Sequence, residues 1–267
     1  MNILGGYIYP DGNQIRKGYA GKMPDSQKAA EPKFPWNATY SYQHFRYTCT
    51  GTEATILLMQ NLPPMTSEDT ILLPEYLCDT VIKGCGSSGA SLRYYSIKDD
   101  FSIDIKDIEK KLDDSVVLIY VIHYFGIAQP LRIMEMLKDL QKKRKISILE
   151  DVTQAAYSVA PGRIGVGKYL VGGFRKWWPI PDGGFVCIKE EKWRYSKEPA
   201  HRKEEIIADQ LLLALWREDL RLGDQDEIER FLVRQLKVNQ RRYTDIIPRT
   251  MSELSNSILF QLNQKKN

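Results

Sequence analysis

The sequence predicts an α/β fold in which a mostly parallel sheet is flanked by helices. Short apolar segments alternate with amphipathic ones along the middle of the chain, and such alternation is typical of strand–helix–strand units. Residues 115–125 are apolar and rich in β-branched side chains, as expected for a strand buried on both faces of a parallel sheet. With 267 residues, of which 43% are apolar, the chain can bury one large core.

The predicted strands are short apolar runs bounded by turn residues, and the predicted helices carry apolar residues at spacings of three and four. Ser102 and Asp104 are suitable caps for the helix that follows them. The expected strands cover residues 70–74, 92–97, 115–125, 146–150, 169–173 and 183–188. The expected helices cover residues 51–62, 75–86, 102–112, 130–145, 204–220 and 226–238.

Three parts of the chain differ in composition. Residues 1–45 are rich in Gly, Pro and Tyr without sustained periodicity, which predicts an extended N-terminal arm. Residues 46–190 hold the alternating elements and form the expected large domain. After Ile188 the strand pattern stops, so residues 191–267 are expected to form a helical segment.

Charge and cysteine content exclude several classes of protein. The net charge of +4 is spread along the chain, and the basic run at 142–145 is typical of a solvated helix end rather than of a nucleic-acid patch. The longest apolar run is too short to cross a membrane, and the N-terminus is not typical of a leader. The four cysteines lack the spacing of a metal site or a disulfide framework. We therefore expect a cytoplasmic protein that binds neither nucleic acid, membrane nor metal.

Ligands of parallel α/β sheets bind beyond the carboxyl ends of the strands. The strand at 146–150 is followed by Asp151 and Gln154, a pair that can bind a cationic ring nitrogen and a neighbouring ligand atom. Asp151 could equally cap the next turn. His123 follows the strand at 115–125, where a packed and hydrogen-bonded histidine is more common than a catalytic one.

Two further segments have chemical potential. Gly51 and Thr52 lie at an expected helix N-terminus, where backbone N–H groups favour a phosphate, although an ordinary capped helix has the same pattern. Lys176 lies between Arg175 and two tryptophans in GGFRKWWPIPDGGFV; a lysine among apolar neighbours is favoured as a neutral nucleophile, whereas most lysines are surface charges. The glycines at 165–173 do not match a dinucleotide fingerprint, because Leu170 replaces the third glycine.

An amine, a carboxylate for a pyridinium nitrogen and a helix N-terminus for a phosphate together match the needs of pyridoxal 5′-phosphate (PLP). The order of LPEYLCDTVI, VIHYFGIAQPL, LEDVTQAA and FRKWWPIPDGG resembles the DegT/DnrJ/EryC1/StrS family of fold type I PLP-dependent aminotransferases, over almost the whole chain. The resemblance implies that Lys176 binds the cofactor covalently and moves a proton, that Asp151 pairs with the ring nitrogen, and that Gln154 lies beside the phenolic oxygen. Gly51 and Thr52 correspond to phosphate-binding positions.

The family also implies substrates and assembly. Its members transfer an amino group, commonly from glutamate, to keto-sugars attached to nucleotides, in amino-sugar or polysaccharide biosynthesis. Its sites are built from two subunits, which implies a homodimer. The alternatives are a noncatalytic relative that serves as a binding or assembly module, and a PLP-dependent sugar dehydratase, against which Lys176 argues.

Three departures from the family pattern stand out. Gly173 replaces a serine that helps to hold the phosphate. Cys78 replaces an aromatic residue that covers the cofactor ring, so stacking is either provided by another group, such as Tyr76, or absent. Relatives continue into a small C-terminal domain, which we expect to be missing or truncated here.

Overall fold

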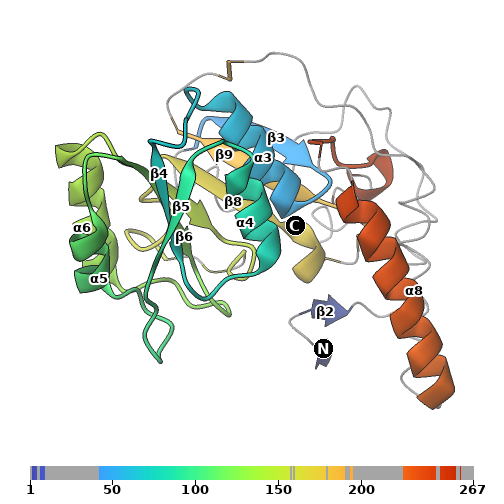
Figure 1. Cartoon of the computed structure of the whole chain (residues 1–267). Helices are drawn as coiled ribbons and strands as arrows, with labels where there is room; N and C mark the ends of the chain where they lie inside the picture. The colour runs from blue at the N-terminus through green and yellow to red at the C-terminus, as the bar shows by residue number, and fades with distance from the viewer. Residues whose placement is uncertain are drawn as a thin grey trace.

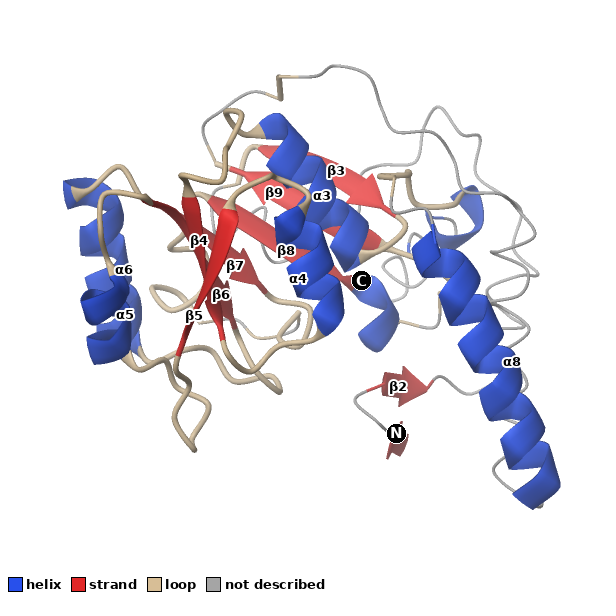
Figure 2. Ribbon diagram, viewed as in Figure 1, coloured by secondary structure: helices blue, strands red, loops and turns tan. Residues whose placement is uncertain are grey.

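Strands from the middle of the chain assemble into one twisted sheet with helices on both sides (Figures 1 and 2). The computed structural model describes residues 2–4, 7–9, 42–156, 158, 160–178, 180–189, 193–194, 225–244, 247–256 and 259. Within these residues the main sheet has seven strands in the order β3-β9-β8-β7-β6-β4-β5. Its strands are β3 (His44–Thr48), β4 (Thr70–Pro74), β5 (Ser91–Tyr95), β6 (Val116–Ile122), β7 (Ser147–Asp151), β8 (Tyr169–Gly173) and β9 (Gly184–Ile188).

The five strands from β4 to β8 pair in parallel, which confirms the predicted parallel sheet. Strand β9 is antiparallel to both of its neighbours, β8 and β3. As a result, β3 runs in the same direction as β8. The chain therefore leaves the sheet at one edge after β3, β4, β6, β7 and β8, and at this edge ligands of such folds bind.

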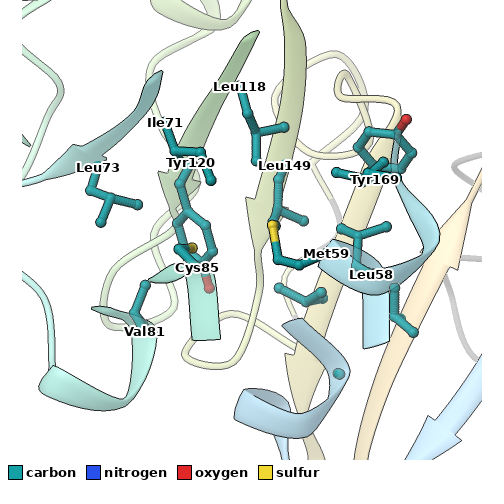
Figure 3. Close-up of a cluster of buried hydrophobic side chains, with 14 of the residues drawn as sticks. Leu58, Met59, Ile71, Leu73, Val81, Cys85, Leu118, Tyr120, Leu149 and Tyr169 are labelled. Carbon is teal, nitrogen blue, oxygen red and sulfur yellow. The ribbon is translucent and has the colours of Figure 1, made fainter. Parts of the chain in front are cut away.

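Helices cover the two faces of the sheet. Helices α3 (Gly51–Asn61) and α4 (Asp79–Gly86) lie together on one face, while α5 (Ile105–Lys111) and α6 (Leu131–Lys143) lie on the other (Figure 1). Successive side chains of β6 point to opposite faces of the sheet and contribute to both cores. Leu118 and Tyr120 pack under α3 and α4, whereas Ile119 packs under α5 and α6. Figure 3 shows the first of these cores, with Tyr120 among aliphatic side chains from β4, β6 and β7.

Most predicted elements agree with the structure. Asp104 caps α5, as predicted, by accepting a hydrogen bond from the Lys106 N–H. Helix α6 ends at Lys143, so the exposed basic run lies at a helix end, as predicted. The C-terminal helix predicted at 226–238 is present as α8 (Gln225–Thr244).

Two predictions at the beginning of the domain need correction. Strand β3 is not predicted from its sequence, because it is a short edge strand of five residues that is only partly buried along most of its length. Helix α4 begins at Asp79 rather than at Glu75, since the Glu75 N–H continues the pairing of β4 with β5 by bonding to the Tyr95 carbonyl. Residues 75–78 are thereby freed to line the ligand edge of the sheet.

Part of the chain lies outside the described residues. The predicted helix at 204–220 falls there, as does most of the predicted N-terminal arm, of which β1 (Asn2–Leu4) and β2 (Tyr7–Tyr9) form an antiparallel pair. The described helices include none with the length and hydropathy needed to cross a membrane.

Candidate active site

A pocket of about 530 Å³ opens at the carboxyl edge of the sheet. Its walls come from the segments that follow β4, β6, β7 and β8, together with the first turns of α3 and α4. All five of the predicted site residues line this pocket: Gly51, Thr52, Asp151, Gln154 and Lys176. Residues separated by 125 positions in the sequence thus meet in one cavity.

Asp151 is the last residue of β7 and is 7% exposed. Its Oδ1 accepts a hydrogen bond of 2.7 Å from the Thr153 N–H, and its Oδ2 accepts one of 2.8 Å from the Tyr120 hydroxyl. The first contact is the local turn bond that the alternative interpretation expects. Asp151 also lines the pocket, so it can both cap the local turn and bind a ligand.

Gln154 lies three residues after Asp151 and is held through its side-chain oxygen. Its Oε1 accepts a hydrogen bond of 3.1 Å from the Phe125 N–H. An amide has one acceptor group and one donor group. The NH₂ group has no partner among the described residues and is available to donate to a ligand in the pocket.

Lys176 ends a single turn of 3₁₀ helix, Phe174–Lys176, that follows β8 directly. Phe174 anchors this turn, because its ring is fully buried and stacks on Phe185 at a centroid distance of 4.8 Å. The Trp177 indole N–H donates to the Thr153 carbonyl at 2.7 Å and ties the turn to the segment after β7. Among the described residues, the Lys176 amine has no hydrogen-bond or ion-pair partner, so it is available to a ligand.

The loop after Lys176 is fixed from the C-terminal part of the chain. Asp182 is 1% exposed and accepts hydrogen bonds from the Ser252 N–H at 2.9 Å, from the Ser252 hydroxyl at 2.5 Å and from the Ser255 hydroxyl. Gly183 follows with a φ of +144°, a conformation that favours glycine. The PDGG sequence therefore returns the chain from the pocket into β9.

The N-terminus of α3 forms the opposite side of the pocket. Thr50 caps the helix by accepting a hydrogen bond from the Glu53 N–H at 3.0 Å, which leaves the N–H groups of Gly51 and Thr52 without a protein partner among the described residues. Both N–H groups belong to the first turn of an 11-residue helix, where the dipole favours an anion. Gly184 of β9 packs against the Thr50–Gly51 peptide bond and holds this turn in place.

His123 does not line the pocket. Its side chain is fully buried, accepts a hydrogen bond of 3.1 Å from the Gln129 N–H at Nδ1, and lies 2.8 Å from the Glu150 carboxylate at Nε2. Because Nδ1 is an acceptor, Nε2 carries the proton and donates to Glu150. The packed, hydrogen-bonded interpretation is confirmed.

The pocket also contains residues that the sequence analysis does not single out. Among them are Arg175, Tyr120, Tyr124 and Thr153. Arg175 could have been found as a second cation beside Lys176, and Thr153 lies within the LEDVTQAA motif. Tyr120 and Tyr124 are hidden within an apolar run, where an aromatic side chain is most simply explained as core.

The rim is aromatic on the side of β4. Tyr76 is 51% exposed and packs against Tyr124, Phe101 and Phe125 at centroid distances of 5.6, 5.5 and 6.5 Å. Cys78 also lines the pocket from the N-cap of α4. A planar ligand in this pocket therefore meets tyrosine side chains as well as a thiol.

Comparisons with solved structures give the same fold. A putative sugar aminotransferase of Streptococcus pneumoniae in a PLP form matches with a TM-score of 0.61 at 14% identity, over 100% of this chain and 67% of its own. Helicobacter pylori PseC, an aminotransferase involved in the biosynthesis of pseudoaminic acid, matches with a TM-score of 0.59 at 17% identity, over 96% and 62%. GDP-4-keto-6-deoxymannose-3-dehydratase with bound GDP-perosamine matches with a TM-score of 0.59 at 15% identity, over 95% and 65%.

These matches are partial in length. The chain spans 53% of the 3-amino-5-hydroxybenzoic acid synthase structure that it also resembles. No relative was found among curated protein sequences. The profile of the DegT/DnrJ/EryC1/StrS aminotransferase family matches residues 37–174, which is more than half of the sequence. The match ends at Phe174, two residues before Lys176. The chain belongs to the DegT/DnrJ/EryC1/StrS aminotransferase family.

Proposed function

We propose that this chain is a PLP-dependent aminotransferase that transfers an amino group from glutamate to a keto-sugar nucleotide, in amino-sugar or polysaccharide biosynthesis. Membership of the family supports the reaction class. The sugar nucleotide is supported by a structural neighbour solved with GDP-perosamine, and the sugar by two neighbours named for sugar or pseudoaminic acid chemistry.

The residues of the pocket fit the cofactor. A cavity of about 530 Å³ lies within the range of about 300–1,000 Å³ typical of small-molecule sites. Asp151 would hold the ring nitrogen, and the NH₂ group of Gln154 would meet the phenolic oxygen. The N–H groups of Gly51 and Thr52 would hold the phosphate, a task that the missing hydroxyl at Gly173 leaves largely to backbone donors and to Arg175.

The observation that carries the proposal is the position of Lys176. Its amine shares one pocket with a carboxylate and a helix N-terminus, and no described residue competes for it. PLP, when bound, supplies an electron sink for the carbon next to the amino group. Lys176 would bind the cofactor covalently and move the proton of that carbon, while Asp151 would keep a positive charge at the ring nitrogen.

The alternatives make different demands on the same pocket. A sugar dehydratase shares this fold, so the fold does not select between the two reactions, and Lys176 is the feature that favours transamination. A noncatalytic module would keep the sheet without covalent cofactor binding.

The test is covalent labelling with added PLP. We expect borohydride reduction to leave a phosphopyridoxyl group on the peptide that contains Lys176, as mapped by mass spectrometry. Lys176→Arg should abolish the label, because a guanidinium stays protonated and cannot attack the aldehyde. Lys176→Ala should do the same. Lys138→Arg is the matched control, since Lys138 is exposed on α6, outside the pocket.

Asp151→Asn separates binding from chemistry. This variant should still be labelled at Lys176, yet it should turn over poorly, since only the charge that faces the ring nitrogen is removed. Labelling that is scattered over surface lysines, or no labelling at all, would favour the binding module instead.

Assembly is a further part of the proposal. We propose a homodimer, because the rim of the pocket exposes the aromatic side chains Tyr76 and Phe125, and apolar surface of this kind is often covered by a second subunit. Light scattering should give twice the monomer mass. A monomer at working concentrations would refute this part while leaving the cofactor chemistry untouched.

A further inference from the structure

The carboxylate of Asp151 is held by two donors on its two oxygens. The Thr153 N–H engages Oδ1 at 2.7 Å and the Tyr120 hydroxyl engages Oδ2 at 2.8 Å. A carboxylate oxygen can accept two hydrogen bonds, so each oxygen keeps one acceptor position. Two simultaneous bonds also prevent rotation of the carboxylate about its own axis.

Tyr120 reaches Asp151 from a neighbouring strand. Ile122 of β6 is the register partner of Asp151, and Tyr120 lies two residues earlier on the same face of β6. An aromatic side chain is long enough to span such a diagonal between strands. The ring is 1% exposed and packed in the core under α3 and α4 (Figure 3), so the hydroxyl has a fixed position.

The surroundings keep Tyr120 protonated. Burial raises the pKa of its hydroxyl well above the ordinary value, and the negative charge of Asp151 raises this pKa further. The nearby Cys85 thiol also has its pKa raised, chiefly by burial, so it adds no competing charge. Tyr120 is therefore a hydrogen-bond donor to Asp151 throughout the working pH range.

We infer that Tyr120 is a positioning residue, whose hydroxyl fixes the Asp151 carboxylate so that its remaining acceptor positions face a protonated ring nitrogen in the pocket. The inference rests on the proposed function, because it concerns the same cofactor. It assigns to Tyr120 an effect that passes entirely through Asp151. Ligands whose ring lacks that nitrogen should not sense the Tyr120 hydroxyl.

The test compares PLP with its 1-deaza analogue, in which a C–H group replaces the ring nitrogen. Dissociation constants are measured for the full chain by fluorescence titration. Tyr120→Phe should weaken PLP binding about ten-fold, as expected for loss of a hydrogen bond to a charged group. The same variant should change the affinity for the deaza analogue by less than about two-fold, because the C–H group of that analogue makes no hydrogen bond to Asp151.

Tyr95→Phe is the matched control. Tyr95 is also fully buried, and its hydroxyl donates to the Tyr120 carbonyl at 2.7 Å, but it does not line the pocket. Its removal should leave both affinities within about two-fold of the wild type, because it costs a buried hydrogen bond away from the ligand.

A double variant covers the case in which Tyr120→Phe alone does not fold. Tyr120→Phe leaves the buried Asp151 carboxylate without one of its donors, and Asp151→Asn removes that negative charge. Tyr120→Phe/Asp151→Asn should bind PLP as well as Asp151→Asn does. A parallel loss of affinity for both ligands, no loss for either, or a further loss in the double variant would overturn the inference. Wild-type protein that binds no PLP would instead overturn the proposed function, and this inference with it.

Discussion

Gly184 of β9 packs tightly against the N-terminus of α3, which lines the pocket. A Cβ atom built at Gly184 would lie 2.2 Å from the Thr50 carbonyl carbon, 2.3 Å from its oxygen and 2.6 Å from the Gly51 nitrogen. Ordinary van der Waals contact begins at 3.4 Å, so the backbones would have to separate by about 1 Å. All three atoms belong to the backbone, and no rotamer change can relieve the overlap.

We expect Gly184→Ala to lower the free energy of unfolding by about 3 kcal/mol, the upper part of the usual cost of overpacking. The strain falls on β9, which pairs with both β3 and β8 at this residue, and on the start of α3. Gly86→Ala is the control, because Gly86 ends α4 with nothing within 4 Å of its Cβ position. That change should be neutral or stabilise by about 0.5 kcal/mol through helix propensity.

The assay is urea unfolding followed by circular dichroism, with the midpoints of both variants compared with the wild type. A PLP titration adds a local measurement, since displacement of the Gly51 and Thr52 N–H groups should weaken phosphate binding at least ten-fold in Gly184→Ala alone. If Gly184→Ala unfolds at the same midpoint as Gly86→Ala, the close packing of β9 on the α3 N-terminus is refuted.

Two other measurements test separate parts of the structure. Glu150→Ala should lower the free energy of unfolding, measured by urea unfolding, by about 3 kcal/mol, because the buried His123 and the N–H groups of Gly165 and Gly167 lose their acceptor. An unchanged midpoint would contradict this. Iodoacetamide should alkylate Cys78, the exposed cysteine, before the buried ones, and PLP should slow that reaction because Cys78 lines the pocket; equal protection of Cys85 would point to a global effect.

The sheet could be predicted because its strands differ strongly in pattern from its helices. Strand β6 (Val116–Ile122) is apolar on both faces, as expected for a strand between two helical layers. Strand β3 lacks such a pattern because it lies at the sheet edge, where partial burial tolerates His44 and Arg46. Its place is set by pairing with β9, a long-range contact that no local pattern encodes.

The candidate site was predictable where one residue implies one kind of chemistry. A lysine between aromatic residues and an aspartate after a buried strand each limit the choice of function, and the structure brings both to one pocket. Tyr120 could not be found in this way, because a tyrosine within an apolar strand fits a core position equally well. Its significance comes from a hydrogen bond across 31 residues of sequence, which only the register of β6 and β7 determines.

The segment after α8 supports a pocket that it does not line. Asp182 lies six residues after Lys176 and accepts hydrogen bonds from Ser252 and Ser255. These bonds connect the loop that leaves the pocket to residues 70 or more positions away in the sequence. A buried carboxylate without these donors would carry a large desolvation cost. The Lys176 turn is therefore held on one side by Trp177 against the β7 segment and on the other by Asp182 against the C-terminal part of the chain. If Lys176 is the nucleophile that we propose, its amine loses little conformational freedom when it binds a ligand, and this positioning favours covalent attachment.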